Sequence, residues 1–213
     1  MLLNEIIGKT GIVYSPEDLK KIGETIKKDC SFFLSSIGKD LLTYAMYRGE
    51  GGLDKYKPVF RKQKVRKDRK PSDTPLELHK LFNDWFLDEY GIKHRSQSLF
   101  ATGDYVAASS YGTSVGIIFP IDKYKFVYSK KYQDLTNDID KARLMEPPKS
   151  ITDEYVDKIY DFMDNGMYSD TDFKAAIKSE NEIMINCNEY YILNIGRGQD
   201  GVTKLLEDLE EYI

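Results

Sequence analysis

The stretch NEIMINCNEYYILNI, residues 181–195, contains two runs of aliphatic and aromatic side chains separated by the short polar segment Cys187-Asn188-Glu189. Runs of this length and composition are typical of strands that are buried on at least one face. The pattern predicts strands over 182–186 and 190–195, joined as a hairpin. Two acids, Glu180 and Glu182, stand where the first of these strands begins.

Outward from this stretch, strand-like and helix-like segments are interspersed along the chain. Further strands are expected at 41–48, 98–102, 115–120 and 124–128, and a short helix at 104–110. Ser15-Pro16 starts a helix that we expect to end at Gly38, and Thr74-Pro75-Leu76-Glu77 is a capping box that opens a helix ending at Gly91. Helices are also expected from Thr152 to 163, over 172–177 and at the C-terminus. This order predicts an α+β fold with one main globular core.

The composition excludes several classes of protein. The chain has 16 Tyr and 10 Phe, which disfavours disorder, and its net charge of −4 disfavours a generally basic nucleic-acid binder. No apolar span is long enough to cross a bilayer, and residues 1–10 lack the pattern of an export signal. The two cysteines, Cys30 and Cys187, lack metal-ligand spacing, so we expect reduced, partly buried thiols, no metal site and a cytoplasmic protein.

One segment departs from the acidic average. In RKQKVRKDRK, residues 61–70, seven of the ten residues are Lys or Arg. The segment is either a solvated loop or edge strand, or a patch that contacts nucleic acid or a nucleic-acid-bound machine such as RNA polymerase. The candidate contact residues are Arg61, Lys62, Lys64, Arg66, Lys67, Arg69 and Lys70.

Other charged residues have structural readings. Arg69, Asp73 and Arg95 are candidates for an internal ion-pair network, and Arg95 is also a secondary candidate for a binding pocket. His79 and His94 are expected to be structural.

Three short segments have the residue types of a nucleotide-processing site. The first is Tyr47-Arg48-Gly49, where a guanidinium suits phosphate oxygens and Gly49 leaves room for them. The second is LFATGD, residues 99–104, followed by Ala107, Ala108 and Tyr111-Gly112. The third is Glu180-Asn181-Glu182, whose two acids share a face if extended backbone reaches Glu180. Each segment alone is also compatible with ordinary surface residues.

In this order, the three segments resemble the mono-ADP-ribosyltransferase superfamily, specifically its Arg-Ser-Glu class and the small enzymes of T4-like phages. The resemblance covers about residues 41–195, and its most specific part is Glu-x-Glu followed by aliphatic residues. Phe100 stands where the family has the first serine of its middle motif, and Thr102 supplies the hydroxyl there.

The resemblance implies a fold of ADP-ribosyltransferase type, with a split mixed or antiparallel β-sheet core, an N-terminal helix and several flanking helices. It further implies a single domain over 1–213, with a helical segment at 1–40, a catalytic core at 41–195 and a C-terminal helix at 196–213.

The same resemblance implies roles for residues in transfer of ADP-ribose from NAD, the substrate, to a macromolecular acceptor, for which protein arginine is the first choice. Glu182 would stabilise the positive charge that develops on the ribose, Glu180 would help deprotonate the acceptor, and Arg48 would hold the dinucleotide. The residues implied in NAD binding are Tyr47, Arg48, Gly49, Thr102 and Tyr111. Arg48 and Glu182 would face one cleft, in the host cytoplasm if the chain is of phage origin.

Two other functions remain open from the sequence. One is an ADP-ribosyltransferase whose acceptor is a nucleic acid, with residues 61–70 as the substrate track. The other is a non-catalytic binding protein on the same scaffold, acting through that basic patch.

Overall fold

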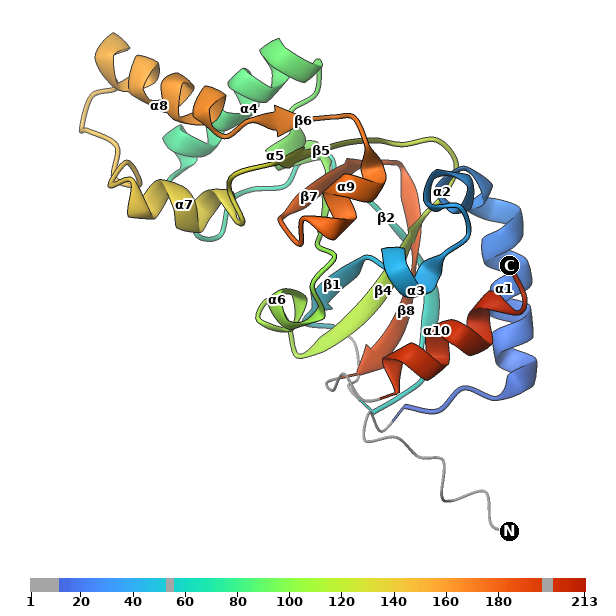
Figure 1. The fold of residues 1–213 in the computed structure, drawn as a ribbon. Helices are drawn as coiled ribbons and strands as arrows, with labels where there is room; N and C mark the ends of the chain where they lie inside the picture. The colour runs from blue at the N-terminus through green and yellow to red at the C-terminus, as the bar shows by residue number, and fades with distance from the viewer. Residues whose placement is uncertain (1–11, 53–55, 197–200) are drawn as a thin grey trace. The chain divides into compact units, whose positions relative to one another are not determined.

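A computed structural model describes residues 12–52, 56–196 and 201–213 of the chain. The fold is α+β, and in this described part ten helices accompany two four-stranded sheets (Figure 1). The chain divides into two compact units. The first comprises the described parts of residues 1–64, 101–124 and 187–213, and the second comprises Val65–Phe100 and Lys125–Asn186.

The first unit is built on an antiparallel sheet with strand order β1-β4-β8-β2. The central strands, β4 (Ser114–Pro120) and β8 (Glu189–Gly196), are almost entirely buried, as their continuous apolar sequence predicts. The edge strands are β1 (Tyr47–Glu50) and β2 (Phe60–Lys64). A bulge between Val115 and Gly116 interrupts the ladder between β4 and β8.

Helices complete the first unit. Helix α1 (Pro16–Asp29) begins at Ser15, whose side chain accepts a hydrogen bond from the backbone N–H of Asp18, and it buries a stripe of Leu19, Ile22 and Ile26. It packs against the C-terminal helix α10 (Val202–Glu210), which also contacts α3 (Leu41–Tyr44). The remaining helices of this unit are α2 (Ser31–Ile37) and α6 (Tyr105–Ser109).

The second unit contains the other sheet, with strand order β3-β7-β5-β6. Its strands are β3 (Leu99–Ala101), β7 (Ile183–Asn186), β5 (Lys125–Ser129) and β6 (Tyr168–Ser169). Helix α4 (Leu76–Tyr90) packs against α8 (Asp153–Asn165), and their apolar side chains form one buried cluster with residues of α7 (Leu135–Lys141), β5 and β7. Short helices α5 (His94–Gln97) and α9 (Phe173–Lys178) complete the unit.

Several elements predicted from sequence are confirmed. The strands at 98–102, 115–120 and 124–128 correspond to β3, β4 and β5, and the short helix at 104–110 corresponds to α6. The helix that starts after Thr152 and the C-terminal helix are also present. Both cysteines are buried free thiols. The interpretation of residues 1–10 lies outside the described part of the chain.

The hairpin prediction for 182–195 is wrong. Strand β7 pairs with β5 in the second unit, whereas β8 pairs with β4 and β2 in the first, so the chain changes sheets at Cys187-Asn188. Sequence periodicity reports that a segment is a strand and does not report which strand it joins, because pairing is decided by long-range contacts.

Three local predictions also need correction. Residues 41–48 are not one strand, since Asp40 caps a short helix through the N–H of Thr43 before β1 begins at Tyr47. The helix from Ser15 does not run to Gly38 but breaks at Cys30 into α1 and α2. Helix α4 starts as predicted, but Pro75 occupies the N-cap and no side chain caps it, so the capping box does not form.

Candidate functional site

Strand β1 holds the first of the three sequence motifs. Tyr47 exchanges two backbone hydrogen bonds with Thr102, of 2.8 and 3.0 Å, so the first and second motifs meet at an isolated bridge. The Tyr47 ring packs edge-on against Tyr105, and burial raises the pKa of the Tyr47 phenol to about 12. The phenol is therefore a neutral hydrogen-bonding group near neutral pH.

Gly49 is required by close packing of backbone on backbone. A methyl group at Gly49 would overlap the carbonyl oxygen of Ala108 and lie 2.8 Å from the carbonyl carbon of Tyr111. Gly112 is constrained in the same way, because a methyl group there would overlap the backbone of Glu50. The space beside Gly49 is thus occupied by the segment that follows α6, and it does not provide the open room for phosphate expected from sequence. Tyr111 itself is 62% exposed.

The Arg48 guanidinium is engaged within its own strand. Its Nε donates to Glu50 Oε1 at 2.6 Å, and the two side chains are 24% and 14% exposed. Residues two apart on a strand project from the same face, so strand geometry alone brings this pair together. Because Arg48 pairs with Gly116 in the ladder, no side chain stands opposite it on β4.

Thr102 supplies the hydroxyl of the second motif. Its Oγ1 accepts a hydrogen bond of 3.0 Å from the N–H of Asp104, and Asp104 in turn caps α6 through the N–H of Val106. The Thr102 side chain is buried, and its hydrogen bond to Asp104 helps to turn the chain from β3 into α6.

Glu182 lies in the second unit, immediately before β7. Its N–H donates to the carbonyl of Gln133 at 2.8 Å, and its Oε1 accepts from Arg95 Nη1 at 2.9 Å. The side chains of Arg95 and Glu182 are only 11% and 19% exposed. Arg95 also donates to the hydroxyl of Thr136 at 3.3 Å. The carboxylate is therefore fixed in position by a long-range ion pair.

Burial dominates the electrostatics of Glu182. Its pKa is raised above the ordinary value chiefly by burial, with a smaller contribution from Asp134, while Arg95 and Arg69 act in the opposite direction. The neighbouring Tyr168 phenol has a strongly raised pKa for the same reason, with the Glu182 charge as the next cause. The cluster has the character of a partly desolvated site in which the ionised carboxylate depends on its cationic partners.

Phe100 lies beneath two guanidinium groups. The Cζ of Arg69 is 4.1 Å and that of Arg95 is 4.8 Å from the centre of its ring. Each contact has the geometry of a cation–π interaction. The phenylalanine that stands in place of a serine thus supports the arginine that holds Glu182. Arg95 Nε is buried without a hydrogen-bond partner in the described part of the chain, which leaves one donor unused.

Glu180 does not lie on β7. Its φ is +61°, in the left-handed region, and it follows the end of α9 as an exposed residue. Extended backbone therefore does not reach Glu180, and strand alternation does not align it with Glu182. The positive φ reflects the turn between α9 and β7.

The structure groups the predicted residues into two sets. Glu180 and Glu182 are in the second unit, and the first unit holds Tyr47, Arg48, Gly49, Thr102 and Tyr111. The convergence of Arg48 and Glu182 on one cleft stays a prediction. Sequence reasoning named Arg69 and Arg95 as possible partners but missed Thr136 and Asp134, because no motif marks residues that approach only through folding.

The basic segment is also divided between the units. Its first part is edge strand β2, where Lys62 pairs with Glu189 at 3.1 Å, and its second part, from Val65 to Lys70, belongs to the second unit. Residues 61–64 thus lie on an edge strand, and a partner contact through them stays a prediction.

The two histidines are buried and within hydrogen-bonding distance of serine hydroxyls, as a structural role predicts. His79 Nε2 is 3.0 Å from Ser96 Oγ, and His94 Nδ1 is 2.9 Å from Ser98 Oγ. Burial lowers the pKa of both rings, that of His94 to about 4, so both are neutral near neutral pH.

Comparisons with known proteins do not assign the chain to a family. No protein-family model matches the chain, and no curated protein and no solved structure is significantly similar to it. Among the described residues, no group of His, Cys, Asp and Glu is arranged to hold a metal ion, and no helix has the length and apolar character needed to cross a bilayer.

Proposed function

We propose that this chain is an NAD-dependent mono-ADP-ribosyltransferase that acts on a macromolecular acceptor, with protein arginine as the first choice, in the cytoplasm. The observation that carries the proposal is Glu182. A carboxylate at the start of a strand is held by Arg95 in a largely buried cluster, at the position where the motif order requires the catalytic acid. Under this proposal the two sheets are the split sheet of an ADP-ribosyltransferase core.

The proposed reaction breaks the bond between C1′ of the ribose and N1 of nicotinamide. The bonding electron pair leaves with nicotinamide, whose ring becomes neutral, and C1′ takes on oxocarbenium character. The Glu182 carboxylate accepts a hydrogen bond from a ribose hydroxyl and stabilises this positive charge more strongly than it stabilises the substrate. A nitrogen of the acceptor then bonds to C1′ and releases a proton, which Glu180 accepts.

Glu180 has a position that suits this second role. It is exposed, whereas Glu182 is largely buried, so the two acids occupy different environments although they are two residues apart. An exposed carboxylate can meet a macromolecular acceptor and return the proton to water. The buried one is suited to a substrate that is drawn out of solvent.

The residues of β1 are proposed to bind the dinucleotide. Arg48 would hold the NAD phosphates with its guanidinium. Tyr47, Thr102 and Tyr111 would contact the nicotinamide and the ribose. Support comes from the hydrogen bonds that tie Tyr47 to Thr102 and from the packing of Gly49 against the segment before Gly112. These contacts fix the backbone that carries Arg48.

A comparison of Glu182→Gln with Glu180→Gln tests the proposal. Incubation with labelled NAD and a cell extract should show transfer by the native chain, and protease or nuclease digestion identifies the acceptor class. Glu182→Gln should lower both transfer and NAD hydrolysis by roughly 10²-fold or more, because the charge that stabilises the oxocarbenium is removed. Glu180→Gln should lower transfer while hydrolysis persists.

A folding control accompanies the labelling experiment, since Glu182 also partners a buried arginine. Near-UV circular dichroism should show native packing for both glutamine variants, because in Glu182→Gln the amide oxygen can still accept from Arg95 and Glu180 is an exposed residue. Undiminished labelling by a folded Glu182→Gln variant would reject the assignment of Glu182.

A further inference from the structure

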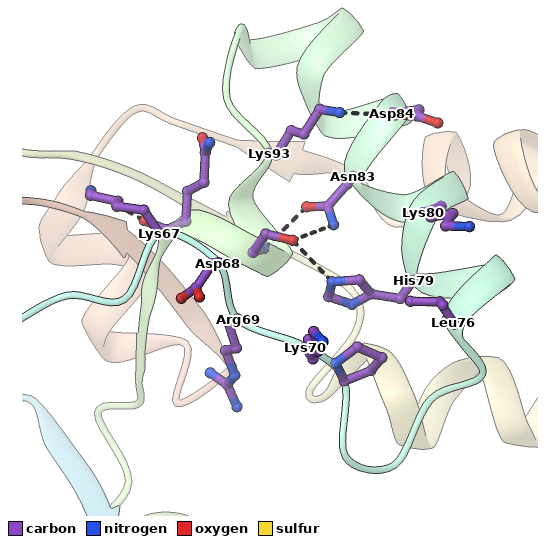
Figure 2. A pocket seen from close by; sticks show the side chains of 13 residues that line it. Lys67, Asp68, Arg69, Lys70, Leu76, His79, Lys80, Asn83, Asp84 and Lys93 are labelled. Carbon is purple, nitrogen blue, oxygen red and sulfur yellow. Dashed lines mark hydrogen bonds and ion pairs between the residues drawn. The ribbon is translucent and has the colours of Figure 1, made fainter.

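The second unit has a hollow of about 340 Å³ at the segment Lys67–Pro71, helix α4 and helix α5 (Figure 2). The volume falls in the range of small-ligand sites. The lining has five cationic side chains and two acidic ones, a local excess of three positive charges on a chain whose net charge is −4. The cationic residues are Lys67, Arg69, Lys70, Lys80 and Lys93.

The floor of this hollow is a closed hydrogen-bond network. Ser96 Oγ accepts from Asn83 Nδ2 at 2.7 Å and lies 3.0 Å from His79 Nε2, and the N–H of Ser96 donates to Asn83 Oδ1 at 3.1 Å (Figure 2). The backbone of Arg69 also interacts with His79, and this contact raises the His79 pKa against the larger effect of burial. Since burial lowers the His79 pKa, the ring is neutral and adds no charge of its own.

This network fixes the basic segment to the helices. The N–H of Arg69 donates to the carbonyl of Ser96 at 3.1 Å, and Lys67 Nζ donates to the carbonyl of Gln97 at 3.4 Å. The Arg69 side chain is held over Phe100. Cationic side chains are thus presented from a backbone that is already in place, which reduces the entropy lost when a ligand binds.

The charges around the hollow are only partly compensated by the protein. Lys93 is 3.6 Å from Asp84, and both side chains are about half exposed, so this pair is weak. Lys70 and Lys80 have no acidic partner among the described residues. Two uncompensated ammonium groups on one rim favour an anionic ligand.

We propose that this hollow binds the backbone of a single-stranded nucleic acid. Lysine ammonium groups attract phosphate as point charges and do not clamp it in the bidentate manner of arginine, which suits repeated phosphates better than one tightly held nucleotide. The exposed side chain of Leu76, 49% accessible, and the ring of Pro71 supply apolar contact for a sugar or a base. Compared with the basic segment 61–70 predicted from sequence, the site includes residues of α4 and excludes strand β2.

The proposal is independent of NAD chemistry and is tested without NAD. Fluorescence anisotropy of a labelled oligothymidylate of about 12 nucleotides measures binding between about 50 and 200 mM salt. The test variant is Lys70→Glu with Lys80→Glu. We expect its Kd to rise at least about tenfold, and the slope of log affinity against log salt to fall by roughly 1.4, since each phosphate contact on a single strand contributes about 0.7.

The matched control is Lys130→Glu with Lys149→Glu, two exposed lysines of the same unit that are outside the lining. Both variants lower the net charge equally, so an equal loss of affinity in the control would overturn the site. Absence of binding by the native chain at about 50 mM salt would also overturn it. Adenosine monophosphate is tested as a competitor beside an unlabelled oligonucleotide. If both displace the labelled oligonucleotide equally well, the hollow is a mononucleotide site and the proposal of a single-stranded ligand is overturned.

Discussion

In the described part of the chain, Arg48 and Glu182 each form an ion pair, Arg48 with Glu50 and Glu182 with Arg95, and the two pairs are formed in different ways. Arg48 and Glu50 lie two residues apart on β1, in the first unit, with the nitrogen and oxygen 2.6 Å apart. Arg95 and Glu182 are 87 residues apart in the chain and meet at 2.9 Å in the second unit. A local pair requires only that a strand forms, whereas the long-range pair requires the whole unit to fold.

The surroundings of the two pairs differ as well. The Arg95–Glu182 pair has Arg69, Phe100, Thr136 and Asp134 close by, and burial raises the Glu182 pKa. Near Arg48, burial raises the pKa of the Tyr190 phenol to about 12 and the Arg48 charge acts in the opposite direction, while the backbone is packed at Gly49 and bridged from Tyr47 to Thr102. Backbone packing at Gly49 holds the strand that carries Arg48. By contrast, an ion pair in a largely buried cluster holds the Glu182 carboxylate.

The largest effect on stability is expected when the long-range pair is broken. Arg95→Ala leaves the Glu182 carboxylate buried without its main cation and removes a contact with Phe100, so the free energy of unfolding should fall by about 3–5 kcal/mol. Urea denaturation of this variant beside Arg66→Ala, whose side chain is 70% exposed, measures the difference. A loss below about 1 kcal/mol in Arg95→Ala would mean that the pair is solvated like an ordinary surface bridge.

The next effect concerns the main-chain packing of the first unit. Gly49→Ala puts a methyl group against the backbone of Ala108 and Tyr111, and it should lower the free energy of unfolding by about 1–3 kcal/mol through overpacking. Gly51→Ala is the matched control, because a methyl group there has no atom within 4 Å. Equal stability of the two alanine variants would show that β1 can move away from the segment before Gly112.

The sequence predicted much of the fold because helix caps and apolar periodicity are local signals. Ser15 and Thr152 start helices as expected, and Leu78, Phe82 and Trp85 of α4 recur at intervals of three and four residues and are buried in one cluster. The prediction failed where partners are distant. The partner sheets of β7 and β8 depend on contacts that no window of sequence contains.

The sequence motifs led to the hypothesis that Arg48 and Glu182 form the candidate site, and their roles stay a prediction. The Arg95–Glu182 bond, the stacking of Arg69 on Phe100 and the Asp134 charge arise only from tertiary structure. Phe100, read from sequence as the loss of a serine, has a role in the fold as a platform for two arginines. The left-handed backbone conformation of Glu180 could not be predicted either, since a positive φ at a non-glycine residue has no reliable signal in the sequence.

The smallest effect on stability is expected for Arg48→Ala. This variant therefore best distinguishes a loss of NAD binding from a loss of folding stability. Arg48→Ala removes an ion pair between neighbours on one strand whose side chains are 24% and 14% exposed, so the free energy of unfolding should fall by about 1–2 kcal/mol. If Arg48 holds NAD phosphates, the same variant should lose roughly ten- to a hundredfold in labelling at low NAD, because a charge-assisted hydrogen bond to the substrate is lost. Labelling measured across NAD concentrations, beside thermal melts, separates the two quantities. A stable Arg48→Ala variant with native labelling at every NAD concentration would remove β1 from the proposed site and leave the Glu182 cluster to account for any activity alone.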